Sequence, residues 1–204
     1  PTRRAAIYRG ERVRGHVLPD VLTSQLRDAD AGAPVGHRVL RIATHDAVRS
    51  RGLGGHLLDA LVDEFGPRAD WLGVAFGATP RLFRFWTAND FGTVHLSTTR
   101  NERSGEYSAL MLRPTSAAGR ALAARHARRL RDRAAGVLAD PLRDADPDVV
   151  RLALRAVDAP AAPDLSAHEW RAGAAAPPRP GGELDLIQLS AATRQAENTC
   201  AGFL

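Results

Sequence analysis

One segment constrains the fold more than any other, because an apolar run ends there in closely spaced glycines and leads into a leucine-rich stretch. It spans Val39–Gly55 and reads VLRIATHDAVRSRGLGG. We predict a strand over Val39–Thr44 and a helix from about Gly54 to Phe65. A strand, a glycine turn and a helix start point several main-chain N–H groups into one concave space, which suits an anion. Gly52 and Gly54 would let the main chain approach a pyrophosphate, so we expect a nucleotide-like diphosphate ligand.

Two familiar diphosphate motifs do not fit this segment. No Lys-Ser or Lys-Thr follows the glycines, as a Walker-type site requires. A dinucleotide-binding site would need G-x-G-x-x-G directly after its strand, and the glycine spacing differs. A glycine pair before a helix is also common in a plain tight turn, so the pattern alone leaves that alternative open.

Strands and helices alternate up to Pro114, which is typical of a compact α/β unit. The patterns predict, in order, a strand within Ala5–Val17, a short helix or turn over Pro19–Leu26, a loop over Asp28–Gly36, a strand over Trp71–Phe76, a helix capped by Thr79 and ending near Asn89, and strands over Phe91–Ser97 and Ser108–Leu112. Aromatic residues at this spacing are expected in the core more than on a base-stacking platform; they are Trp71, Phe76, Phe83, Phe85 and Trp86.

The chain changes character after Pro114. We predict an Ala/Arg/Leu helix over Ala117–Leu138 and a shorter amphipathic helix over Asp148–Val157. The stretch Ala159–Gly182 is dominated by Ala, Pro and Gly, which is typical of a linker. We therefore expect an α/β domain over residues 1–114, a helical extension over 115–158, and a linker with a divergent tail over 159–204.

The composition limits which compartment, metal and partner we expect for the protein. The chain has no long apolar run and no charged-then-apolar leader, so we expect a soluble cytoplasmic protein without a membrane anchor. The single Cys200 excludes an internal disulfide and a thiolate metal cluster, and we expect no metal. The formal charge is +5 and every basic residue is arginine, which suits an anionic partner such as nucleic acid. A GC-rich genome would produce the same arginine bias without any binding role.

Four motifs, read in order, resemble the RNA cytidine acetyltransferase (TmcA) family. Arg49-x-x-Gly52-x-Gly54 fits the R/Q-x-x-G-x-G/A signature of the GNAT acetyltransferases, and it lies in the expected place between a strand and a helix. The other motifs are Arg41–His45, Asp70–Trp86 and Asn101–Leu112. The resemblance covers about residues 10–114, weakens to about Trp170 and disappears after it.

The resemblance implies a GNAT-type mixed sheet with flanking helices, opened at a coenzyme cleft and lacking its first strands before Pro1. It also implies transfer of an acetyl group from acetyl-CoA to the exocyclic amine of cytidine in tRNA or another RNA, giving N4-acetylcytidine. Family members carry an ATP-hydrolysing module ahead of this region, and these residues contain no Walker motif. We therefore expect one part of a longer enzyme, which binds the coenzyme but is not implied to modify RNA alone.

The resemblance places acetyl-CoA contacts in three segments. Ile42, Ala43 and Thr44 would hold the acetyl and pantetheine portion. The pyrophosphate would lie against the turn formed by Arg49, Ser50, Arg51, Gly52, Leu53, Gly54 and Gly55. Arg81 and Arg84 would add contacts from the helix that begins near Thr79, whereas Ala88 stands where some members have an arginine.

The chemistry requires a base, because the cytidine amine is a poor nucleophile that must lose a proton as the C–N bond forms. The candidates are His45 and Glu106, with Tyr107 as an acid towards the departing thiolate. Main-chain N–H groups near Thr44 would polarise the thioester carbonyl. The alternatives are a capping loop histidine at His45 and a salt bridge across a hairpin at Glu106.

The arginine-rich helix suggests contact with an RNA backbone through Arg125, Arg128 and Arg129. A solvated helix face is the alternative. Two other functions also remain open at this point. The chain could be a GNAT enzyme that acetylates a protein or small-molecule amine, or a noncatalytic RNA-binding module that keeps only the fold.

Overall fold

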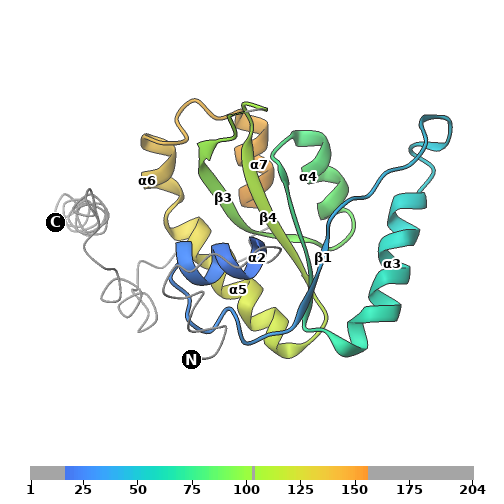
Figure 1. Ribbon diagram of the computed structural model, residues 1–204. Coiled ribbons are helices and arrows are strands. Elements are labelled where there is room, and N and C mark those ends of the chain that lie inside the picture. The colour runs from blue at the N-terminus through green and yellow to red at the C-terminus, as the bar shows by residue number, and fades with distance from the viewer. Residues whose placement is uncertain (1–16, 103, 156–204) are drawn as a thin grey trace, which may run out of the picture.

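The computed structural model describes residues 17–102 and 104–155, which contain one four-stranded sheet in the order β1-β2-β4-β3 (Figure 1). The strands are β1 (Gly36–Val39), β2 (Trp71–Gly77), β3 (Gly92–Arg100) and β4 (Tyr107–Pro114). β1 runs parallel to β2, whereas β4 is antiparallel to both β2 and β3. The sheet is therefore mixed, which confirms the predicted fold class.

Helices cover both faces of the sheet. The bounds are α2 (Val17–Asp20), which continues into a π-helical turn at Val21–Gln25, α3 (Leu53–Phe65), α4 (Pro80–Thr87), α5 (Ala117–Asp132), α6 (Ala134–Ala139) and α7 (Pro147–Arg155). Short 3-10 turns occupy Asp46–Val48 and Gly66–Arg68. The described chain thus forms a three-layer α/β/α arrangement in which the sheet is the middle layer.

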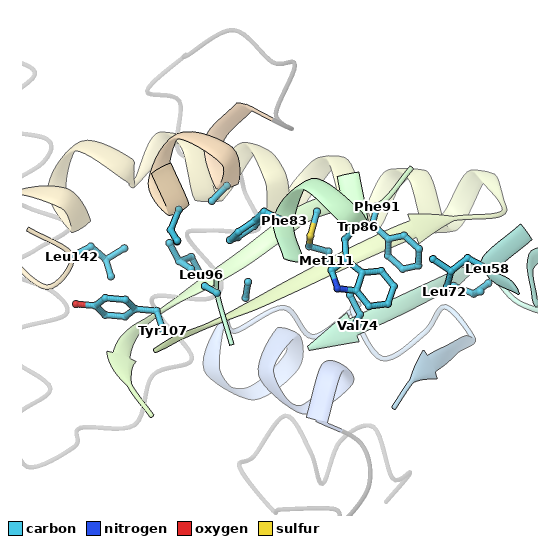
Figure 2. Close-up of a cluster of buried hydrophobic side chains, with 14 residues drawn as sticks. Leu58, Leu72, Val74, Phe83, Trp86, Phe91, Leu96, Tyr107, Met111 and Leu142 are labelled. Atoms are coloured by element: carbon cyan, nitrogen blue, oxygen red, sulfur yellow. The ribbon is translucent and has the colours of Figure 1, made fainter. Parts of the chain in front are cut away.

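The larger hydrophobic cluster lies between the sheet and the layer of α3, α4 and α7 (Figure 2). It includes Leu58 of α3, Phe83 and Trp86 of α4, and Val149 of α7. Trp86 contacts Phe91 with its ring edge-on, at 4.9 Å between centroids. Burying a side chain of this size contributes about 1.5–3 kcal/mol, so these aromatics anchor the layer.

A second cluster fills the opposite face, where Leu18 and Leu22 pack with Trp71 and with Leu122 of α5. β4 divides its side chains between the clusters, because successive residues of a strand point to opposite faces. Thus Met111 belongs to the first cluster and Leu112 to the second. The expectation that the aromatic residues of this region form core is confirmed: Trp71, Phe83 and Trp86 are buried, and Phe76 and Phe85 pack against the first cluster.

Several predicted elements are confirmed closely. β2 and α3 begin within one residue of the expected positions. The hydroxyl of Thr79 accepts a hydrogen bond from the N–H of Leu82, and Pro80 is the first helical residue, so α4 has the expected N-terminal cap.

Two predicted elements are wrong in their extent. The strand expected over Val39–Thr44 is instead Gly36–Val39, because the pairing with β2 stops at Val39 opposite Val74. The helix expected over Ala117–Leu138 breaks at Arg133, although no proline or glycine stands there. The break separates α5 from α6, whose Val137 and Leu138 then pack against the first cluster, so burial overrides local helix propensity.

Residues beyond Pro114 share the hydrophobic clusters of the sheet, since Leu122 belongs to the second cluster and Leu142 to the first. The boundary expected at Pro114 stays a prediction. The predicted strand within Ala5–Val17 and the linker and tail over 159–204 lie outside the described residues, apart from Val17 at the start of α2.

Candidate coenzyme site

The two parallel strands of the sheet part at the position where the sequence predicts the ligand. β1 pairs with β2 only as far as Val39, whereas β2 continues to Gly77 alongside β4. Residues 40–44 therefore leave the sheet, and their main-chain groups make no hydrogen bond to another described residue. Ile42 and Thr44 are half-buried and Ala43 is exposed. The segment expected to hold the acetyl and pantetheine portion thus carries unpaired amides and carbonyls beside the opening between strands.

The turn after this segment ends at an uncapped helix N-terminus. Gly52 is the N-cap of α3, with φ of +80°, and no side chain caps the helix there. The first helical hydrogen bond is donated by the N–H of His56 to the carbonyl of Gly52. The N–H groups of Leu53, Gly54 and Gly55 are therefore left for an outside acceptor. Together with the helix dipole, they form a site that favours a phosphate.

The glycines of this turn have two different roles. Gly52 provides the left-handed backbone that the helix start requires, which other residues adopt at a cost. A Cβ at Gly54 would lie 3.0 Å from Cε2 of Phe85, and one at Gly55 would lie 2.9 Å from Oδ1 of Asn89. The missing Cβ of Gly54 therefore lets α3 pack on α4, and the expectation that it also gives a phosphate access stays a prediction. Contact through the N–H of Gly54 stays a prediction.

The arginines assigned to the coenzyme are on the surface. Arg49 forms an ion pair of 2.6 Å with Asp46, and both side chains are largely exposed. Arg51, Arg81 and Arg84 are exposed and form no ion pair with a described residue. An exposed pair contributes little to stability, so Arg49 can exchange Asp46 for a phosphate at small cost. Ser50 also has a positive φ, of 60°.

The three catalytic candidates do not form a connected group among the described residues. His45 is exposed, and its Nδ1 accepts a hydrogen bond of 3.3 Å from the N–H of Ala47, which is the capping role weighed as an alternative. Glu106 lies over the end of β2, where a Cβ at Gly77 would meet its Oε2 at 2.0 Å. No ion pair involving Glu106 is present in the described chain, so the hairpin salt bridge is not seen.

Tyr107 is buried in the first hydrophobic cluster, whereas the neighbouring Glu106 is only half-buried. Its hydroxyl donates a hydrogen bond of 3.3 Å to the carbonyl of Pro141. The guanidinium of Arg100 lies 5.1 Å from the centre of its ring. In Figure 2 the ring lies beside Leu142 in the first cluster. The role of Tyr107 as an acid stays a prediction, and it requires the hydroxyl to exchange its present acceptor.

The three arginines assigned to RNA differ in their surroundings. Arg125 donates two hydrogen bonds to Oδ2 of Asp28, at 2.8 Å from Nε and 2.6 Å from Nη2. Arg129 donates to the carbonyl of Leu26. Both hold the loop after α2 against α5, whereas Arg128 is exposed. Binding of RNA by all three stays a prediction, and Arg128 is the one whose geometry leaves it open to a phosphate.

Sequence reasoning missed a buried polar group behind these arginines. Asp28 and His126 are both buried, and Nε2 of His126 lies 2.8 Å from Oδ2 of Asp28. Burial by itself raises the pKa of Asp28, but the hydrogen bonds from His126 and Arg125 outweigh it and hold that pKa well below its usual range. The signal was the spacing: His126 continues the buried stripe of Gly119 and Leu122 along α5.

Neither a membrane span nor a metal cluster is found in this part of the chain. No described helix is long and apolar enough to cross a bilayer. The described His, Cys, Asp and Glu residues include no group of three that could hold a metal ion.

Comparison with known proteins shows the family of the chain. Relatives include proteins named tRNA(Met) cytidine acetyltransferase TmcA from Haloferax volcanii, 60% identical over 89% of this chain, and from Haloarcula marismortui, 59% identical over 85%. The protein of the same name from Nitrosococcus halophilus is 42% identical over 78% of the chain. The chain spans about a quarter of the length of these relatives, at 24%, 22% and 21%.

The match to the Haloferax protein covers 181 residues, so it cannot end at Trp170. The expectation that the resemblance disappears there is corrected. The family model described as GNAT acetyltransferase 2 matches residues 2–67 and 55–116, which together span more than half of the sequence. The chain therefore belongs to the GNAT acetyltransferase 2 family.

Proposed function

We propose that this chain is the acetyl-CoA-binding part of an enzyme that acetylates the exocyclic amine of cytidine in tRNA. The observation that carries the proposal is the uncapped start of α3, placed directly after the point where β1 and β2 separate. The reaction class follows from the family, and the acceptor follows from relatives that bear the name tRNA(Met) cytidine acetyltransferase. A cytoplasmic location and a tRNA partner follow from the same acceptor.

The main chain would do most of the coenzyme binding. The free N–H groups at the start of α3 would bond the pyrophosphate, and Arg49 and Arg51 would add charge beside it. The unpaired main chain of residues 40–44 would run along the pantetheine arm. Arg81 and Arg84, on the exposed side of α4, would reach the remaining phosphate oxygens. This arrangement uses side chains mainly for charge and the backbone for shape.

In the transfer step, the cytidine amine attacks the carbonyl carbon of the thioester. The C–N bond forms, the C–S bond breaks, the thiolate of CoA departs, and the nitrogen loses one proton to a base. Main-chain N–H groups near Thr44 would stabilise the oxyanion. Of the candidate bases, Glu106 lies at the end of β2, whereas Nδ1 of His45 already accepts a hydrogen bond. We therefore place Glu106 first and His45 second.

A chimeric enzyme tests the acceptor. The matched segment of the Haloferax protein would be replaced by this chain, and acetylation of tRNA cytidine would be measured beside acetylation of peptide amines. We expect activity on tRNA and none on the peptides. The Glu106→Gln variant should lower kcat while leaving the affinity for acetyl-CoA unchanged.

Arg49→Gln and Arg151→Gln form a matched pair for the coenzyme, since both arginines are exposed and each pairs with an aspartate three residues before it. Losing a charged phosphate contact should raise KM for acetyl-CoA about tenfold in Arg49→Gln only. A chimera that acetylates peptides and ignores tRNA would favour a protein or small-molecule acceptor. A chimera that binds tRNA without turnover would instead indicate a noncatalytic module.

A further inference from the structure

An apolar cavity lies near the edge of the sheet that is opposite the edge next to the coenzyme site. It has a volume of about 70 Å³ and lies between β3, α5, α6 and α7. Its wall is mostly aliphatic, with Val94 from β3, Leu130 from α5, Val137 from α6 and Ala153 from α7. β3 and β1 are the two edges of the sheet, and Figure 1 shows α6 on the β3 side and α3 on the β1 side. The cavity is therefore separate from the start of α3.

Among the described side chains that line the cavity, one fully buried polar atom has no hydrogen-bond partner. His126 lines the cavity and is 1% exposed, and its Nδ1 is unpaired within the described residues. Its Nε2 is held by Asp28, which does not line the cavity. A carboxylate only accepts hydrogen bonds, so Nε2 carries the hydrogen and Nδ1 keeps a lone pair in the neutral ring. The free acceptor is therefore the ring nitrogen that Asp28 does not hold, on a side chain that lines the cavity.

The other titratable groups at the wall determine which ligand charge is tolerated. Burial is the largest cause that lowers the pKa of His95 to about 4, and the positive charges of Arg133 and Arg129 act in the same direction. Burial outweighs the attraction of Asp28 and lowers the pKa of His126 as well. Both rings are therefore neutral near pH 7. Arg129 and Arg133 also line the cavity and keep it unfavourable for a cation.

We propose that this cavity binds a small uncharged molecule with an apolar body and a single hydroxyl or N–H donor, which bonds to Nδ1 of His126. One water molecule needs a space of roughly 10–15 Å³ and two to four polar partners. The cavity is several times larger than that, and its wall is mostly aliphatic. An apolar body fills such a space better than water does, and a single donor satisfies Nδ1 of His126, the fully buried acceptor left unpaired among the described side chains of the wall.

Titration with phenol and anisole tests the proposal on the whole chain. The two probes have similar apolar bodies, but only phenol can donate a hydrogen bond. Chemical shift changes of the Val94 and Leu130 amides would report binding. We expect phenol to bind at least about fivefold more tightly than anisole, as one hydrogen bond implies. Saturating acetyl-CoA should leave phenol binding unchanged.

Two alanine variants give the matched control. Ala134 lines the cavity, whereas Ala124 is exposed on α5, so Ala134→Leu should weaken phenol binding and Ala124→Leu should not. Unchanged circular dichroism would show that both variants fold, and the phenol–anisole comparison needs no variant at all. The proposal is overturned if phenol gives no saturable shift, if anisole binds equally well, if acetyl-CoA displaces phenol, or if Ala134→Leu has no effect.

Discussion

Replacing Arg125 with methionine separates a structural role for this arginine from a role in RNA binding. Asp28 is fully buried, and Arg125 supplies two of its hydrogen bonds and a permanent positive charge at 2.6 Å. Arg125→Met keeps the aliphatic stem but removes the guanidinium from a buried carboxylate that also accepts from the N–H of Asp30 and contacts His126, whose ring is neutral near pH 7. Removing one partner of a buried ion pair costs about 3–5 kcal/mol. We expect a loss near the lower end, because the Arg125 side chain is 34% exposed and solvent screens the pair.

Urea unfolding followed by circular dichroism measures this loss, with Arg151→Met as the control. Arg151 pairs with Asp148 in an exposed i, i+3 ion pair, so its replacement should cost no more than about 0.5 kcal/mol. The pKa of Asp28 is depressed, so its contribution is present at neutral pH and is lost as the pH falls below the ordinary range of an aspartate. The difference between Arg125→Met and the wild type should therefore shrink in acid. An Arg125→Met loss below about 1 kcal/mol, or one equal to the control, would refute a structural role for the pair.

Three further perturbations test other parts of the account. The pKa of His95 is lowered to about 4, so in mild acid the unfolded chain binds a proton at His95 that the folded chain does not bind. Moving from pH 7.5 to 5 should therefore lower the free energy of unfolding by about 2 kcal/mol through His95. A His95→Gln variant that loses as much stability over the same pH change would contradict this. Gly52→Ala should lower the free energy of unfolding in urea by about 1 kcal/mol, because φ of Gly52 is +80°. Gly136→Ala should instead raise it by roughly 0.5–1 kcal/mol, because Gly136 lies inside α6 and no atom lies near its Cβ position. Arg128→Gln should reduce the slope of log affinity for RNA against log salt by about 0.7 without loss of stability, and an unchanged slope would remove Arg128 from the interface.

Local sequence patterns were sufficient to predict where the two helices beside the coenzyme site, α3 and α4, begin. A proline after a threonine marked the start of α4, and the leucine spacing marked α3, because caps and helical periodicity depend on neighbouring residues only. The extent of β1 could not be predicted in this way. Apolar residues continue past Val39, but the strand ends where its pairing with β2 stops, and that depends on contacts between distant parts of the chain.

Long-range packing explains the other differences. Beyond the break at Arg133, the partly buried Val137 and Leu138 pack against the first cluster, and neither residue differs locally from one in a continuous helix. The pairing of Asp28 with His126 joins residues 98 positions apart. Asp28 lies in a polar stretch whose composition predicts a surface loop, so no local pattern indicates that its side chain is buried. The tight approach of Gly54 to Phe85 likewise depends on how two helices meet.

The central claim is that the free main chain at the start of α3 holds a diphosphate. Isothermal titration of the chain with acetyl-CoA and with S-acetylpantetheine, which lacks the diphosphate, tests it most directly. We expect saturable binding of one acetyl-CoA per chain, much weaker binding of S-acetylpantetheine, and reduced affinity for acetyl-CoA in a Gly52→Val variant. Equal affinity for the two compounds, or no binding of acetyl-CoA at all, would contradict the claim.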